Sequence, residues 1–349
     1  MITTAIICEF NPLHSGHKKL LDYAKTFSDR VVCIMSGNFT QRGLPACCDK
    51  YKRAKHALIA GADLVVELPT VFATASAENF AYGAIAIADK MHADYLLFGS
   101  ECGDIDKLAE CAKKLLNAEV NRQIADEIKK GVSYPKAVAN AINSSILEKP
   151  NNVLGIEYIK ALITAQSKIK PITVTREDNY NNAPNKYASS GALRTDVSLR
   201  EKYTFNYVIK DLDDEIEKKF GQAATSILAL KTPEELRSIE GVSEGIENRI
   251  FSADKSQGYE KMLEEIKTKR YTRLRLQRIV LNAILNVTKE YAKSAKSSDV
   301  ATKALAVKST AAELLALTNG CIDELTQRAD RLYYSLSTAT PPQKLIKID

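Results

Sequence analysis

Hydrophobic and polar positions divide the chain into two unlike regions. Over roughly the first 175 residues, short apolar runs alternate with segments whose apolar residues recur at helical spacing. The runs predict strands near residues 4–8, 31–35, 64–68, 95–98 and 172–175. The segments between them predict helices over 16–27, 49–60, 77–91, 105–116 and 120–130. This alternation is typical of a doubly wound parallel sheet, so the predicted fold is α/β and Rossmann-like.

Two further helices are expected before the second region begins. One follows Ser133 as N-cap, with Pro135 in its first turn, and the other covers 153–165. Beyond about Asp211 we expect no more strands, because helical periodicity with Lys, Glu and Arg on the polar faces continues to the end. The pattern predicts a first domain over 1–205 and an all-α domain over 206–349. Within the latter, 291–309 is rich in Ala, Lys and Ser and is interpreted as a weak helix or linker.

Histidine placement points to a ligand site. Two of the 4 histidines stand in His14-Ser15-Gly16-His17, between the first predicted strand and the first predicted helix. In an open α/β sheet this is where ligands bind, and a glycine, a helix N-terminus and two imidazoles suit phosphate oxygens. We infer the phosphate chain of a nucleotide. The alternatives are two structural histidines at chance spacing, or a zinc pair, which needs further ligands although His56 and His92 lie in separate helical patterns.

Polar loops follow the other predicted strands. Residues 9–12, 36–43, 99–101 and 176–178 come at the carboxyl ends of strands, which converge on one edge of the sheet. Further along, Ser189 and Ser190 open a short helix whose first N–H groups could hold an anion, with Arg194 one turn later. The alternative for this segment is a plain N-cap and a surface arginine.

Composition narrows the class of protein. With 349 residues, 45% hydrophobic and 26% charged, the chain should fold around a sizeable core. Its 7 cysteines show no C-x-x-C spacing and the chain starts in a predicted strand, so we expect a reduced, cytoplasmic protein. No apolar run approaches the ~20 residues that cross a bilayer. A net charge of +6 permits a nucleic-acid partner without requiring one.

A basic run in the second region suggests an RNA contact. Between 267 and 278 there is no acidic residue, and Tyr271 could stack on an unpaired base. The basic members are Lys267, Lys269, Arg270, Arg273, Arg275 and Arg278. Alternatively, these side chains are solvated or paired with Glu264 and Glu265.

Several motifs together resemble a known family. The histidine motif, combined with Ser189, Ser190 and Arg194, resembles the nucleotidyltransferase superfamily. More narrowly, the chain is similar to the bacterial tRNA(Met) cytidine acetate ligases in 9–17 (EFNPLHSGH), 35–46 (MSGNFTQRGLPA), 61–69 (GADLVVELP), 98–101 (FGSE), 150–155 (PNNVLG), 241–250 (GVSEGIENRI) and 267–273 (KTKRYTR).

The resemblance implies a reaction and its ligands. It implies a nucleotidyltransferase-like, ATP-binding catalytic domain over 1–205 and a helical tRNA-binding domain over 206–349. Such a ligase joins acetate to N4 of the wobble cytidine in elongator tRNA(Met), through acetyl-adenylate and release of pyrophosphate, with ATP and Mg²⁺. Two alternatives stay open, namely an RNA-binding homologue without catalysis and a nucleotidyltransferase that adenylylates a small metabolite.

The resemblance also implies roles for individual residues. His14 and His17 would be the catalytic pair on the phosphates. Gly99 would approach the nucleotide through its backbone, Asn152 and Arg176 match ATP-binding positions, and Ser189, Ser190 and Arg194 follow by superfamily analogy. The remaining ATP-binding positions are Ile7, Cys8, Glu9, Phe10, Asn11, Pro12, Leu13, Ser15, Gly16, Lys18, Lys19 and Leu20. The expected tRNA-binding residues are Lys267, Lys269, Arg270, Tyr271, Arg273 and Arg275.

Two stretches depart from the family pattern. Asn181 and Asn182 stand where a His-Asp pair is expected, and the similarity fades after Leu281, without the family's Pro-Tyr-Ile-Arg-like motif. These departures place acid/base or positioning chemistry and the geometry of tRNA recognition in question.

Overall fold

The fold is built on one sheet. The computed structural model describes residues 1–349 except 133, 143, 177–187 and 341–344. In these residues seven strands have the order β5-β4-β1-β2-β3-β6-β7. Their bounds are β1 Thr3–Cys8, β2 Arg30–Ser36, β3 Leu64–Leu68, β4 Tyr95–Ser100, β5 Lys170–Thr175, β6 Lys303–Lys308 and β7 Ile346–Ile348. The pairs among β1 to β5 are parallel, which confirms the predicted α/β class.

The helices of the first region also match the predictions. Each predicted helix is present, including the one that follows residue 133, although Ser133 itself lies outside the described residues. The second of the two late helices starts earlier than predicted, because Pro150 occupies its first turn, where proline's missing N–H costs nothing. The bounds are α1 Ser15–Lys25, α2 Lys50–Ala60, α3 Thr70–Ala73, α4 Ala77–Lys90, α5 Ile105–Leu116, α6 Ala118–Lys129, α7 Tyr134–Ile142 and α8 Pro150–Thr164.

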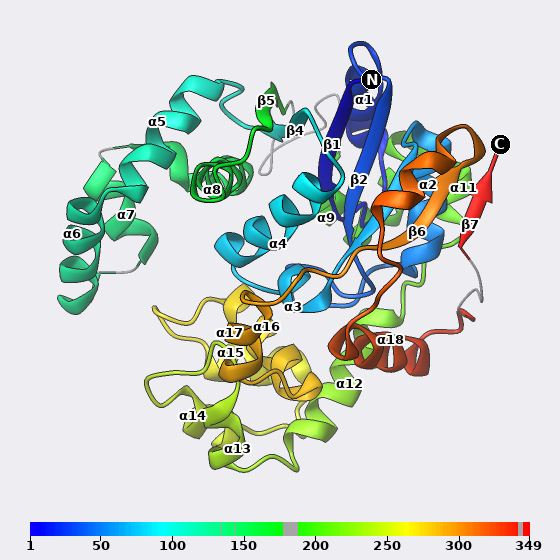
Figure 1. Ribbon diagram of the computed structural model, residues 1–349. Coiled ribbons are helices and arrows are strands. Elements are labelled where there is room, and N and C mark those ends of the chain that lie inside the picture. Colours follow the sequence, from blue (N-terminus) through cyan, green and yellow to red (C-terminus); the bar gives the residue numbers. More distant parts are fainter. Residues whose placement is uncertain (133, 143, 177–187, 341–344) are drawn as a thin grey trace.

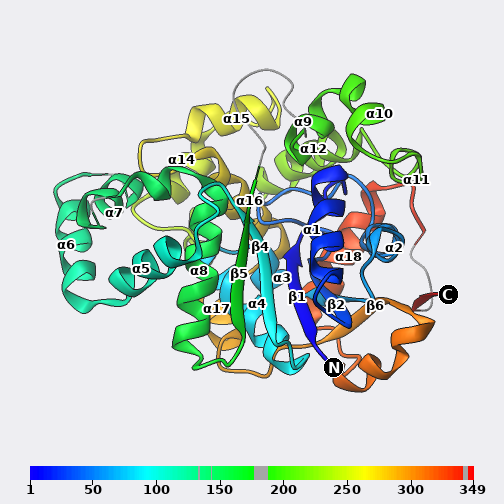
Figure 2. The ribbon, with the colours of Figure 1, turned by 90° about the horizontal axis from the view of Figure 1, so that it is seen from above.

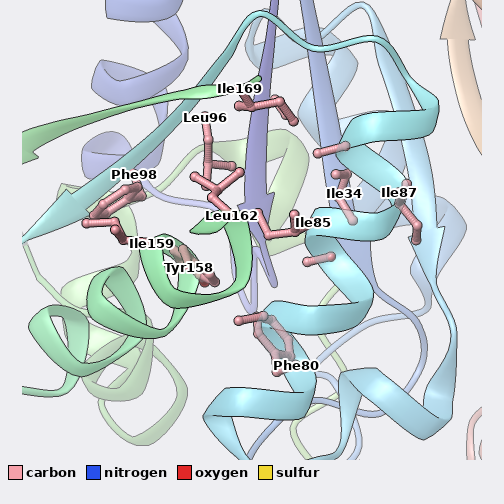
Figure 3. Packing of buried hydrophobic residues seen from close by; sticks show 14 of the residues in the cluster. Ile34, Phe80, Ile85, Ile87, Leu96, Phe98, Tyr158, Ile159, Leu162 and Ile169 are labelled. Carbon is pink, nitrogen blue, oxygen red and sulfur yellow. The ribbon is translucent and has the colours of Figure 1, made fainter. Parts of the chain in front are cut away.

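Helices cover both faces of the sheet. Successive strand residues alternate between the faces, so that Val32 and Ile34 lie in one core and Val31 and Cys33 in the other. Side chains of α4 and α8 pack on the first face, where Ile85 and Ile159 lie among the strand side chains (Figure 3). Side chains of α1 and α2 pack on the second face. Burial on both faces explains why the strands are apolar throughout and so were evident from sequence.

A separate helical segment follows. Its α-helices from residue 216 onward share a third core and lie at the end of the sheet opposite the N-terminus (Figures 1 and 2), whereas Val208, in an earlier short helix, belongs to the core on the second face of the sheet. The bounds are α9 Ser190–Thr195, α10 Arg200–Tyr203, α11 Asn206–Ile209, α12 Ile216–Leu228, α13 Pro233–Ser238, α14 Ile246–Ser252, α15 Tyr259–Ile266, α16 Arg273–Leu285, α17 Lys289–Ala295 and α18 Glu324–Leu336. Short 3₁₀ helices cover Ser145–Glu148, Val197–Leu199 and Ser309–Leu317.

One prediction about the second region was wrong. Strands do not stop near Asp211, because β6 pairs antiparallel with β3 and β7 pairs parallel with β6. The stretch 291–309 is therefore not a linker throughout, since it contains most of α17 and the whole of β6. The sequence Lys-Ala-Leu-Ala-Val-Lys carries little strand signal by itself. Leu305, Ala306 and Val307 become fully buried only because the edge of β3 is there to pair with.

A buried ion pair joins the helical segment to the sheet. Lys50, at the start of α2, has no exposed surface, and its Nζ lies 2.6 Å from Glu67 Oε1 on β3 and 2.6 Å from Asp330 Oδ2 on α18. Asn38 also donates to Asp330 at 2.9 Å. Burial alone would lower the pKa of Lys50, but the two carboxylates outweigh it and raise that pKa. Charge pairing thus fixes α18 against the loop that follows β2.

Candidate active site

The topology places the histidine motif at a natural ligand site. From β1 the chain adds β2 and β3 on one side, whereas β4 and β5 lie on the other. Strand order therefore reverses between β1 and β4, and ligands bind in the crevice at the carboxyl ends of such strands. The loop after β1 carries His14 and His17, and Gly99 lies near the end of β4.

Main-chain hydrogen bonds hold the loop after β1 in place. The buried guanidinium of Arg53 on α2 donates to the carbonyl oxygens of Glu9 (2.7 Å), Ser36 (3.1 Å) and Gly37, so it ties the ends of β1 and β2 together. Asn11 Oδ1 accepts from the Cys47 N–H at 2.7 Å. A loop fixed at its backbone can present side chains in one orientation.

The helix α9 supports the same loop from the other side. Arg194 donates to the Asn11 carbonyl at 2.6 Å, and Ser190 Oγ donates to the Pro12 carbonyl at 3.1 Å. Ser189 is the N-cap of α9 and accepts from the Ala192 N–H at 3.2 Å. The segment predicted to hold an anion is therefore beside the histidine motif, and its Ser190 and Arg194 support the loop that carries the motif.

The two histidines cap α1 reciprocally. His14 Nδ1 accepts from the Gly16 N–H at 3.1 Å, and the His14 N–H donates to His17 Nδ1 at 3.3 Å. This is a capping box made by imidazoles instead of the usual Ser and Glu. The rings stack with centroids 3.7 Å apart and planes 27° apart. Because both Nδ1 atoms accept, a neutral ring carries its proton on Nε2 in each case.

The surroundings keep both imidazoles neutral. Burial, followed by the positive charge of Arg176, lowers the pKa of His14 to about 3. Burial, His14 and Arg176, in that order, hold the pKa of His17 well below its usual range. His14 is 1% exposed, and its Nε2 has no hydrogen-bond partner in the described part of the chain. A buried donor without a partner is costly, so its orientation suits an acceptor supplied by a ligand.

Two adjoining cavities meet at the second histidine. One, of about 320 Å³, is lined by His14, Gly16, His17 and Thr175, among others, and the second, of about 270 Å³, extends toward α16. His17, Leu20, Gly99 and Arg176 line both. We call the two together the cleft. Taken together, the volumes fall in the ~300–1,000 Å³ range of small-molecule sites.

Glycine at position 99 lets an arginine cover the strand end. A Cβ built there would lie 2.9 Å from Arg176 Cγ, closer than real Cβ contacts. Arg176 Nη1 donates to Asn151 Oδ1 at 3.4 Å, and Asn151 in turn donates its Nδ2 to Glu101 Oε1 at 2.7 Å. Residues at the ends of β4 and β5 and the start of α8 thus form one polar wall of the cleft.

The predicted ATP-binding residues divide into two groups. Most line the cleft, namely Ile7, Cys8, Glu9, Phe10, Asn11, His14, Gly16, His17, Lys19, Leu20, Gly99, Arg176, Ser189, Ser190 and Arg194. Pro12, Leu13, Ser15, Lys18 and Asn152 are not among the lining residues. Lys18 instead pairs with Asp22 one turn along α1.

Asn152 is buried next to the cleft wall that Asn151 forms. It is 3% exposed, its Oδ1 accepts from the Cys102 N–H at 3.0 Å, and its Nδ2 donates to the Ile146 carbonyl at 3.0 Å. The amide therefore joins the loop after β4, through its oxygen, to the 3₁₀ helix Ser145–Glu148, through its nitrogen. The neighbouring Asn151 is the asparagine that lines the cleft.

Sequence reasoning missed two arginines of the cleft. Arg42, in the loop after β2, and Arg278, on α16, line the cavity next to His17 and Arg194. Arg278 stood out only as the last member of the basic run. No local pattern reveals that it faces the nucleotide site, because α16 reaches the cleft through tertiary packing.

The rest of the basic run is more paired than predicted. Arg270 pairs with Glu244 at 2.8 Å, Lys267 with Glu264 at 3.3 Å, and Arg273 with Glu264 at 3.3 Å and with Glu260. These pairs are exposed, and such pairs contribute about 0–1 kcal/mol, so they hold the basic side chains only weakly. Glu265 instead accepts from the Asp254 N–H at 3.1 Å.

The prediction that Tyr271 stacks on an RNA base was wrong. The side chain is 3% exposed, and its hydroxyl bonds with Ser243 Oγ at 2.8 Å. The Arg275 guanidinium lies 4.1 Å from the ring centroid and covers one face. The tyrosine is a core residue because its hydroxyl bonds to the turn before α14, a contact that sequence spacing does not show.

The zinc alternative finds no support in the described residues. They contain no group of three or more His, Cys, Asp or Glu side chains that could hold a metal, and His56 Nε2 lies 2.9 Å from Asp211 Oδ2.

No helix in the described part of the chain has both the length and the apolar surface that crossing a bilayer requires. The expectations that concern Asn181 and Asn182 lie outside the described residues.

Chemically, the cleft is built to bind and polarise a polyphosphate. It combines neutral Nε2–H donors, the guanidinium groups of Arg42, Arg176, Arg194 and Arg278, and Glu9 as the acidic side chain among the described lining residues. Fixed donors and positive charge stabilise negative charge that develops on phosphate oxygens.

Comparisons with known proteins agree with this geometry. The HIGH Nucleotidyl Transferase family matches residues 1–329. The tRNA(Met) cytidine acetate ligase of Clostridium perfringens is 37% identical, over 90% of this chain and 86% of that protein. The enzyme of the same name from Acetivibrio thermocellus is 39% identical, over 82% of this chain and 78% of that protein.

A solved structure extends the agreement to the whole fold. Thermotoga maritima TmcAL, crystallised with alpha-thio ATP, superposes with a TM-score of 0.87 at 28% identity, over 96% of this chain and 95% of that chain. The cleft, the fold and the sequence similarity therefore agree, and the chain belongs to the HIGH nucleotidyltransferase family, within its group of tRNA(Met) cytidine acetate ligases.

Proposed function

We propose that this protein is an ATP-dependent ligase that acetylates N4 of the wobble cytidine of elongator tRNA(Met), using acetate. The observation that carries the proposal is the reciprocal histidine cap. It leaves a buried Nε2 of His14 without a hydrogen-bond partner in the described residues, on a side chain that lines the cleft together with His17 and Arg176. Relatives named for this reaction, and a solved relative that holds an ATP analogue, support it.

The first step activates acetate. A carboxylate oxygen attacks the α-phosphorus of ATP, the bond to the bridging oxygen breaks, and pyrophosphate leaves with the electron pair. Charge shifts among phosphate oxygens during this exchange, so positioned donors and cations do most of the catalytic work. The Nε2–H groups of His14 and His17 and the guanidinium of Arg176 are placed for this role. Because the low pKa of each imidazole keeps it neutral, the rings donate hydrogen bonds and do not transfer protons.

The second step consumes the acetyl-adenylate. The cytosine N4 attacks the carbonyl carbon, AMP leaves, and N4 loses a proton. The cytidine must therefore reach the cleft. The helix α16 offers a path, because the basic run surrounds its start while Leu274 and Arg278 line the cleft. Lys267, Lys269, Arg270 and Arg273 are the side chains we assign to tRNA phosphates, with Arg275 beside them.

Mg²⁺ would accompany the triphosphate. This ion keeps several waters and binds through phosphates and one or two carboxylates, so it does not need a cage of protein ligands. Glu9 fits such a position, since it lines the cleft and its Oε1 also accepts the Gln41 N–H at 2.8 Å. When bound, the ion would neutralise phosphate charge.

The test is a direct assay for the product. Purified protein is incubated with ATP, Mg²⁺, labelled acetate and bulk bacterial tRNA, and nucleosides are analysed for N4-acetylcytidine. We expect labelled acetylcytidine that disappears in His14→Ala. Pyrophosphate release that depends on a metabolite other than acetate would instead indicate an adenylylating enzyme. Tight tRNA binding without ATP turnover would indicate an RNA-binding homologue.

A further inference from the structure

Arg278 belongs to the nucleotide cleft, although it is carried by the helical segment. It lines the cavity shared with His17, Arg176 and Arg194, and it also borders a separate cavity of about 200 Å³ between α16 and the turn from α3 to α4. Burial, followed by the positive charge of Arg275, lowers the pKa of Arg278 to about 10. The guanidinium of Arg278 is therefore largely removed from solvent, yet it still lines the cavity that a ligand would fill.

The guanidinium has few partners. In the described residues Arg278 makes one hydrogen bond, from Nη1 to the Gln41 carbonyl at 3.4 Å, and no ion pair. An arginine carries five N–H donors in a planar fork suited to phosphate. By contrast, the buried Arg200 pairs with Asp214 at 2.6 Å, and Arg53 is surrounded by carbonyl oxygens.

That single hydrogen bond is not what docks α16. The backbone of Arg278 lies directly against Gly43, where a built Cβ would come within 2.5 Å of Arg278 N. The same loop is held by Phe39, which lies in the helical core, and by the Tyr333 hydroxyl, which donates to the Ala46 carbonyl at 3.1 Å. The side chain of Arg278 can therefore serve a ligand without carrying the interface.

The charge of the cleft indicates which ligand. Arg42, Arg176, Arg194 and Arg278 line the same cavity, against Glu9 as the acidic residue among its described lining. Arg194 also pairs with Glu217 at 3.4 Å. A triphosphate has more phosphate oxygens than an adenosine monophosphate, so it can bind more of these guanidinium groups. The exposed basic side chains before α16 remain for RNA phosphates.

We propose that Arg278 binds the β- and γ-phosphates of ATP and the pyrophosphate that leaves. This assignment rests on the proposed function, because it takes ATP as the nucleotide. It makes the helical segment part of the ATP site, so the segment that meets tRNA also recognises the triphosphate.

The test compares nucleotides on the intact protein. Dissociation constants for ATP and AMP are measured by titration calorimetry for wild type, Arg278→Gln, Arg278→Lys and the control Arg237→Gln. Arg237 is an arginine of the same segment that pairs with Glu247 and lines neither cavity of the cleft. Thermal unfolding without ligand verifies that each variant folds.

We expect Arg278→Gln to weaken ATP about tenfold to a hundredfold, as loss of charge-assisted hydrogen bonds does, while AMP affinity stays unchanged. Arg278→Lys should recover part of the preference for ATP, and the control should behave as wild type. Equal weakening of ATP and AMP would overturn the assignment, because that is the effect of a structural role. Unchanged ATP affinity with weaker tRNA binding would also overturn it and reassign Arg278 to RNA.

Failure of the proposed function gives a different result. A wild-type protein that binds ATP but forms no acetylcytidine would refute the ligase, while the ATP-to-AMP comparison would still decide the role of Arg278.

Discussion

Replacing His14 tests the central claim about the cleft, because this residue has two separable roles. Its Nδ1 caps α1, and its buried Nε2 is the donor that we assign to the ligand. His14→Ala removes both roles. His14→Asn keeps a side-chain oxygen at the N-cap, where Asn is among the best residues, but removes the ring and its Nε2.

The magnitudes follow from these contacts. Loss of an N-cap costs about 1 kcal/mol of stability, so the alanine variant should be the less stable of the two. Loss of one preorganised donor to a developing charge typically slows chemistry by about 10²- to 10³-fold. Both variants should therefore form acetyl-adenylate about 10²- to 10³-fold more slowly than wild type, although only the alanine variant loses the cap.

The assay is pyrophosphate release in single-turnover mixtures with acetate, beside urea unfolding and tRNA binding. Both variants should keep tRNA affinity near wild type, because Lys267, Lys269, Arg270 and Arg273 line neither cavity of the cleft. A wild-type rate in His14→Asn would refute the reasoning, since capping alone would then account for the histidine. A rate loss that tracks stability, large in alanine and absent in asparagine, would lead to the same rejection.

Three further predictions concern pH, packing and RNA. The pKa of His14 is about 3 in the folded protein and 6.5 in the unfolded chain, so the unfolded state binds a proton first as the pH falls. The free energy of unfolding should therefore decrease between about pH 6.5 and pH 3, by up to ~1.4 kcal/mol per pH unit for this residue. In His14→Asn, the urea midpoint should depend less on pH over this range. Lys50→Met leaves Glu67 buried without its cation and should lower the free energy of unfolding by ~3–5 kcal/mol. The double variant with Glu67→Gln should recover part of this lost stability. An unchanged urea midpoint in the single variant would contradict the importance of the buried pair. Arg270→Ala combined with Arg273→Ala should weaken tRNA binding and reduce its salt slope by about 1 for each phosphate that the variant no longer binds, without change in pyrophosphate release, whereas an unchanged slope would return these side chains to a solvated surface.

The first half of the fold could be predicted because its signals are local. Parallel strands covered on both faces are apolar along their whole length, and the helices between them repeat their apolar residues along one side. The histidine site was predictable for the same reason. His14, Gly16 and His17 lie within one turn after β1, so the residues that form the helix cap are close together in the sequence.

The remaining features depend on contacts between distant segments. The strand β6 exists because β3 offers it an edge, and its own sequence has little preference for a strand. Tyr271 resembles an exposed aromatic in a basic run, yet packing buries it. That Asn152 binds ATP stays a prediction, whereas its hydrogen bonds to Cys102 and Ile146 became evident only in the structure.

The sequence by itself therefore determined the parallel sheet, its covering helices and the position of the histidine turn between β1 and α1. Only the tertiary structure decided which other residues reach that turn, because burial and long-range hydrogen bonds have no period along the chain. Arg53 clamps the strand ends from α2, and Arg278 enters the cleft from α16, some 260 residues beyond the histidines it joins. Folding brings these two arginines to the same end of the sheet. What each arginine contacts depends on carbonyl groups and cavities that distant segments form, so the sequence alone does not show it.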